Sequence, residues 1–142
     1  MAFSAAAPLA AIVALVDALS SVDDTTTGIP KTVSERVNVS VSIGGMTPND
    51  QTTGVVEREV RYFVLFSVRV DGNQATAEAA LGTYLDQFIT ALYAPANRTL
   101  GGTANKVRID SSIARSPEYG LYVGQEVRLY PLEVVTSQRI NP

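Results

Sequence analysis

The segment GVVEREVRYFVLFSVRV, residues 54–70, predicts one long β-strand, because its residues alternate between two sets with different chemistry. Side chains of a strand point alternately to opposite faces, and one set here is a core face of Val, Tyr and Phe. The other set is charged towards its ends but carries Phe63 and Leu65 at its centre. A strand of this length extends about 55 Å, whereas a domain of this size has a radius of gyration of about 14 Å. The strand must therefore bend, or project from the body and be covered by something else.

The N-terminal residues 5–19 predict a helix, because their large apolar residues recur at helical spacing. Ser4 stands where the helix would begin, and Pro8 fits its first turn, where a missing N–H costs little. The helix is apolar nearly all round, so we expect it to be covered on more than one side. The apolar run is too short to span a bilayer, and no positive charge precedes it as in a secretory signal, so no membrane association is expected.

Residues 33–43 alternate cleanly and predict a half-buried strand before the long one. Residues 44–54 and 94–105 are rich in Gly, Pro and Asn without periodicity, so both are expected to be long loops. Residues 21–30 form a polar connector.

After the long strand, residues 74–93 place apolar side chains on one stripe and predict an amphipathic helix. Strands follow at residues 106–115 and 125–140. The apolar phase of the last strand shifts at Pro131, which predicts a bulge there or a position whose N–H side faces away from partners. The chain therefore predicts a single α+β domain, residues 1–142, with a mainly antiparallel four-stranded sheet and two helices packed on it, in the order α-β-β-α-β-β.

Composition argues against an enzyme. The chain has no Cys, His or Trp, so it has neither disulfides nor His-dependent chemistry, and we expect no catalytic residue, metal ligand or cofactor. Glu57 and Glu59 are paired carboxylates, but we interpret them as a solvated strand end with Arg58 and Arg61 as counter-charges. A net charge of −3 argues against a surface that grips nucleic-acid phosphates.

Phe63 and Leu65, with Arg61 and Arg69 beside them, are expected to form a subunit interface on the second face of the long strand. The alternative is that the N-terminal helix covers one face of this strand and the second helix covers the other.

In its order of segments the chain resembles the tail terminator proteins of long-tailed bacteriophages, also called tail completion or minor tail proteins. The resemblance spans nearly the whole chain and lies in pattern rather than in a residue motif. The matching segments are the apolar N-terminal helix, then RVNVSVSIGG, VEREVRYFVLFSVRV, DGN with AEAALGTYLDQFITALY, and QEVRLYPLEVVTSQ.

This resemblance implies a homohexameric ring that caps the tail tube, stops its polymerisation and offers a docking face to head–tail connector proteins. DNA would pass through the channel without specific binding. The protein would lie at the head-proximal end of the tail in the virion, after assembly in the host cytoplasm, where a chain without Cys fits. Met46 and Arg98, in the two expected long loops, become candidates for contact with tail tube subunits, the alternative being that both loops are mobile surface.

Three alternatives to a tail terminator remain open, and an enzyme, against which the composition argues, is one of them. Another is a head–tail connector or stopper ring of the phage neck. The third is a small non-viral protein-binding module, which a measurement of mass in solution would separate from a ring.

Overall fold

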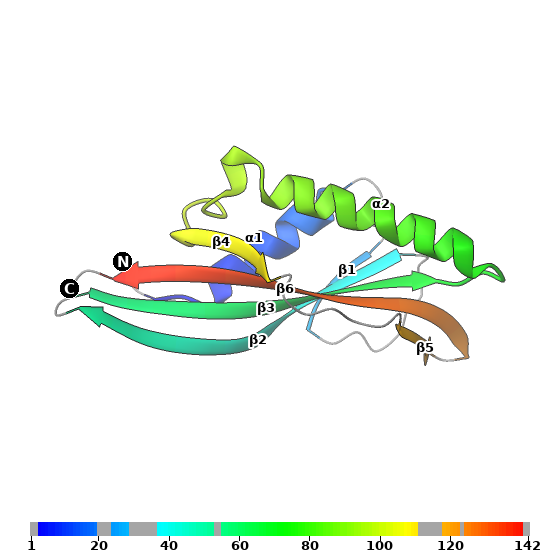
Figure 1. Cartoon of the computed structure of the whole chain (residues 1–142), viewed down its shortest axis with the longest axis horizontal. Helices are drawn as coiled ribbons and strands as arrows, with labels where there is room; N and C mark the ends of the chain where they lie inside the picture. Colours follow the sequence, from blue (N-terminus) through cyan, green and yellow to red (C-terminus); the bar gives the residue numbers. More distant parts are fainter. Residues whose placement is uncertain are drawn as a thin grey trace.

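A computed structural model describes residues 3–19, 24–28, 37–52, 55–110, 118–122 and 124–140. Two α-helices and six strands make an elongated molecule, with three long strands running most of its length (Figure 1). The elements are α1 (Ala6–Asp17), β1 (Asp24–Thr27), β2 (Val37–Thr52), β3 (Val55–Arg69), α2 (Gln74–Leu92), the 3-10 helix η1 (Pro95–Asn97), β4 (Lys106–Asp110), β5 (Glu118–Tyr122) and β6 (Gln125–Ile140).

The sheet has the order β1-β2-β3-β6-β4, with β5 also paired to β6. All pairs are antiparallel except β1 with β2. The predicted mixed α+β class is confirmed. The predicted four-stranded sheet has two strands too few, because the structure adds β1 and β5. Strand β1 lies in the expected polar connector, and β5 lies in a segment for which no strand was expected. Each is only four or five residues long, so neither shows a periodicity of its own, and each forms by pairing with a longer neighbour.

The expected loop at residues 44–54 is wrong, because β2 continues as a strand through Thr52. This part of β2 pairs with β3 along its length, and register shifts between Ile43 and Gly45 and between Asp50 and Thr52 absorb the irregularity. Pro48 is tolerated because β1 pairs only with residues 38–41, which leaves Pro48 on an open edge.

The expected bulge at Pro131 is also wrong, since β6 pairs with β3 in unbroken register from Val127 to Ile140. The Ser137 carbonyl accepts a hydrogen bond from the Asn105 N–H on the β4 side. Odd-numbered residues of β6 therefore turn their backbone groups away from β3. The missing N–H of Pro131 faces the interval between β4 and β5, where no described strand pairs with it.

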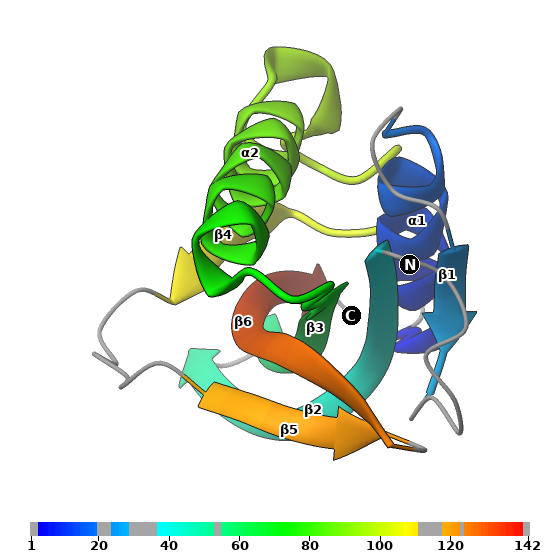
Figure 2. The same ribbon diagram turned by 90° about the vertical axis from the view of Figure 1, so that its right-hand side faces the viewer.

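Both helices lie on the same side of the sheet (Figure 2). The core between them and the sheet contains the even-numbered residues of β3 from Val60 to Val68, together with Ile12 and Val16 of α1 and Leu81 and Phe88 of α2. Phe66 and Phe88 meet edge to face at 5.7 Å between ring centroids. The alternative in which the two helices cover opposite faces of β3 is therefore wrong.

The two helices begin and pack largely as predicted. Ser4 Oγ accepts a hydrogen bond from the Ala7 N–H in the first turn of α1, and Asn73 caps α2 by accepting from the Ala75 N–H. Helix α1 contacts β1, β2 and α2, so it is covered on more than one side. Gly82 of α2 does not mark close packing, because a side chain there would meet no atom within 4 Å.

Candidate functional site

One face of the sheet carries neither of the described α-helices, and we call it the helix-free face. It consists of the odd-numbered side chains of β3 from Glu57 to Arg69 and the residues that pair with them on β2 and β6, extended by their β4 partners. Strict alternation along β3 puts these side chains opposite the core. The residues singled out from the sequence, Arg61, Phe63 and Leu65, lie consecutively on this face.

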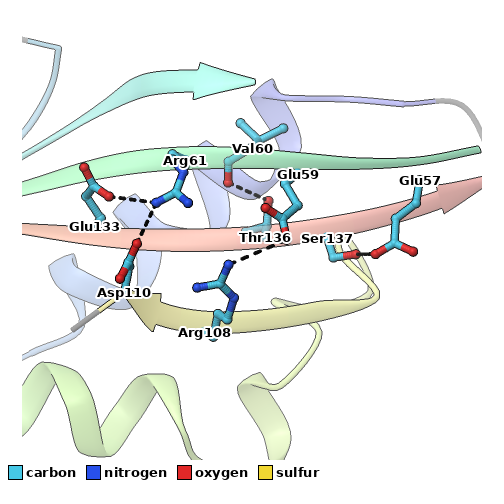
Figure 3. A network of polar contacts seen from close by, with 9 residues as sticks. All are labelled: Glu57, Glu59, Val60, Arg61, Arg108, Asp110, Glu133, Thr136 and Ser137. Atoms are coloured by element: carbon cyan, nitrogen blue, oxygen red, sulfur yellow. Dashed lines mark hydrogen bonds and ion pairs between the residues drawn. The ribbon is translucent and has the colours of Figure 1, made fainter. Parts of the chain in front are cut away.

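Arg61 is the centre of a charged lattice on the helix-free face. Its Nη1 atom lies 2.8 Å from Asp110 Oδ2 and 2.9 Å from Glu133 Oε2. The three side chains come from β3, β4 and β6 and converge in Figure 3. These two hydrogen bonds raise the pKa of the Arg61 guanidinium above its usual value, Asp110 having the larger effect.

The two glutamates of β3 extend the same lattice. Ser137 Oγ donates to Glu57 Oε1 at 2.7 Å, and Arg139 lies 3.4 Å from the other Glu57 oxygen. Glu59 pairs with Arg108 at 3.6 Å. The hydrogen bond from Ser137 is the largest cause that holds the pKa of Glu57 below its usual value, although burial partly opposes it. The counter-charges expected from Arg58 and Arg61 are instead supplied by β4 and β6.

The charged lattice covers a buried apolar residue, Val135, rather than a ligand site. Val135 is only 2% exposed although neither of the described α-helices lies on its side of the sheet. It is the register partner of both Arg61 and Arg108, whose side-chain stems can shield it from water. The cavity beside it measures about 120 Å³, below the 300 Å³ or so of a typical ligand pocket. We therefore assign the lattice a structural role.

An apolar strip interrupts the charges in the middle of the face, and we call Phe63, Leu65 and Pro131 the central patch. All three side chains are half-buried, and Leu65 pairs directly with Pro131. The ring of Phe63 lies over Gly44 of β2, where an added Cβ would come within 2.6 Å of it. Phe63 therefore already has one intramolecular role, which is to cover a glycine at a strand irregularity.

The other predicted site residues lie apart from the central patch. Arg69 is at the far end of the face, where it pairs with Asp71 at 3.3 Å. Met46 is 55% exposed and lies on a strand, not in a loop, opposite Val60 and thus on the other face of the sheet. Arg98 is exposed in the turn after η1, as expected.

A second polar cluster joins β5 and β6 to α2. Glu78 Oε1 accepts hydrogen bonds from Tyr119 Oη and from Arg128 Nε. The Arg128 guanidinium also stacks near the Tyr119 and Tyr130 rings, and its side chain is only 9% exposed. The hydrogen bond from Tyr119, followed by that from Arg128, lowers the pKa of Glu78 below its usual value.

Sequence reasoning missed the β4 and β6 halves of the charged lattice. The pattern that could have predicted them is a charged residue at every second position, as in Lys106, Arg108 and Asp110. Nothing in the sequence alone says which strand such a row will face.

Within the described ranges, no three acidic side chains gather closely enough to hold a metal ion. In the same part of the chain, neither helix is both long and apolar enough to cross a bilayer. Comparisons of the sequence with models of protein families and with curated proteins return no match.

Proposed function

We propose that this protein is a structural component of a phage tail that acts as a tail terminator. In this proposal it forms a ring, a hexamer by resemblance, that caps the tail tube and stops its polymerisation. It also presents a docking face to connector proteins of the head, and DNA passes through its channel.

The observation that carries the proposal is the central patch. A sheet covered by helices on one side exposes half-buried Phe63, Leu65 and Pro131 on the other, away from the helices. In a monomer, such a face usually alternates polar residues throughout. A neighbouring subunit would remove this apolar surface from water, at about 25 cal/mol for each Å² buried.

The surrounding lattice suits a subunit interface. Its four acidic groups, Glu57, Glu59, Asp110 and Glu133, balance four basic ones, Arg61, Lys106, Arg108 and Arg139. A neutral, internally paired rim does not repel an identical subunit. A ring requires two different patches on each subunit, and the central patch would supply one of them. Met46 and Arg98 remain candidates for contact with the tube.

The test is the mass of the assembled protein, measured by analytical ultracentrifugation for the parent chain and for Phe63→Glu and Leu65→Glu. We expect the parent to sediment as a ring and both variants as folded monomers. A buried charge at the patch would cost several kcal/mol in the ring and less in a free subunit, where the patch is only half-buried.

The matched control is Ile89→Glu, which places the same charge on an exposed apolar residue of α2, on the helix side. This variant should assemble like the parent. A parent that remains monomeric both alone and with tail tubes would refute the ring. Assembly of Phe63→Glu and Leu65→Glu with parental mass would refute the central patch as its interface. A single ring of different size that joins head to tail without stopping tube growth would favour a stopper of the neck.

A further inference from the structure

A second surface lies at the outer edge of β4, where a cavity of about 490 Å³ opens beside the end of α2. It is lined by Tyr93, Arg98, Asn105, Lys106 and Val107. This volume falls within the range of binding pockets. The cavity shares only Lys106 with the charged lattice, so it is separate from the central patch.

The backbone of β4 points into this region. Tyr93 Oη accepts a hydrogen bond of 2.9 Å from the Ile109 N–H, so Ile109 directs its backbone groups away from β6. Successive residues of a strand point their backbone groups to opposite sides, and Val107 is two residues earlier. Val107 therefore also presents its N–H and C=O at the outer edge, where no described strand pairs with β4.

The same cavity is cationic. Arg98 is exposed and forms no ion pair with any residue in the described part of the chain. Lys106 also lines the cavity, and its charge acts on Glu57 of the charged lattice as well. An open strand edge next to the two cations Arg98 and Lys106 is suited to an extended, acidic protein segment.

We propose that the outer edge of β4 binds an extended peptide segment of a partner protein, which adds as a strand at Val107 and places a carboxylate between Arg98 and Lys106. The proposal goes beyond ring formation and does not depend on it. A nucleic acid fits less well, because two cations do not form the row of positive charge that tracks a phosphate backbone.

The opposite edge of the sheet, formed by the part of β2 beyond its pairing with β1, differs in chemistry. There β2 carries Pro48 and two register shifts, which are features that discourage strand addition. Strand β4 is itself only five residues long and carries Lys106, Arg108 and Asp110, which also discourage strand addition. The Tyr93 hydroxyl occupies the Ile109 N–H and leaves the Val107 backbone open. The length available for pairing is therefore short, and the carboxylate contact is needed to add affinity.

The test titrates the ¹⁵N-labelled protein with the peptide acetyl-Thr-Val-Asp-Val-Thr-amide and follows amide chemical shifts. We expect saturable shifts at the Val107 amide. The same peptide with Asn in place of Asp should bind about tenfold more weakly, and so should the variants Arg98→Gln and Lys106→Gln. Arg69→Gln, at the opposite end of the sheet, is the matched control and should leave the affinity unchanged.

Tyr93→Phe separates strand addition from simple charge attraction. Removal of the hydroxyl frees the Ile109 N–H, so the peptide should bind at least as tightly and the Ile109 amide should now shift. Absence of a Val107 shift, or equal affinity for the Asp and Asn peptides, would overturn the proposal. If inorganic phosphate or a DNA oligonucleotide saturates the site and displaces the peptide at lower concentration, the pocket is a phosphate site instead.

Discussion

Phe63 and Gly44 show how one contact between neighbouring strands shapes a surface. The phenyl ring occupies the space that a side chain at position 44 would need, so the absence of a side chain lets the ring pack against β2. Gly44 is therefore required for the shape of the central patch rather than for backbone freedom.

Replacement of this glycine tests the contact. Gly44→Ala places a Cβ 2.6 Å from Phe63 Cε2, so the ring must move, and we expect a loss of about 1–3 kcal/mol of unfolding free energy in urea denaturation. Gly82→Ala is the counterpart, because it lies in an exposed helix position with free space and should stabilise the protein by about 1 kcal/mol. Equal stability of Gly44→Ala and the parent would show that Phe63 is free to leave Gly44.

At the scale of elements, the strand pair β5–β6 is tied to α2 through Glu78. This carboxylate is the only described acid bonded to the nearly buried Arg128. We expect Glu78→Gln to lower the free energy of unfolding by about 1–2 kcal/mol, because Arg128 loses its charged partner. The loss is no larger because the Glu78 side chain is itself 43% exposed to solvent. Thermal unfolding followed by circular dichroism measures this. Asp86→Asn, a change of the same kind at an exposed position of α2, should have almost no effect.

Elements with an unbroken period were predictable from the sequence, and those that depend on a partner were not. The period of β3 and α2 is carried by their own residues, so both were predicted nearly to their ends. The second half of β2 has no period and is held extended by β3. The site follows the same division. Phe63 and Leu65 stand out in the β3 alternation, whereas the partners of Arg61 come from residues 49 and 72 positions away along the chain.

At the scale of the whole molecule, stability should fall at both extremes of pH. Folding lowers the pKa of Glu57 and Glu78, so their contribution is complete above their ordinary value of 4.5 and is lost as the pH falls through the lower folded values. Folding raises the pKa of Tyr62, through burial, and of Tyr119, through its hydrogen bond to Glu78. Their contribution is complete below 10.0 and is lost as the pH rises through the higher folded values.

Urea midpoints measured across pH test this expectation. The double variant Glu57→Gln with Glu78→Gln should flatten the acid limb and leave most of the alkaline limb, which Tyr62 still carries. An acid limb as steep in the double variant as in the parent would mean that other carboxylates determine acid unfolding.

The position of β6 between β3 and β4 has a consequence for synthesis on the ribosome. Strand β3 is central, yet one of its two neighbours is β6, which emerges from the ribosome after all the other described strands. Until residues 125–140 have appeared, β3 shows an unpaired edge that includes the backbone beside Tyr62 and Phe66. Contacts this distant in sequence form slowly, and an exposed central edge is a template for aggregation. Native folding should therefore begin only after release of β6, so that a stalled nascent chain is held by chaperones while a completed chain is not.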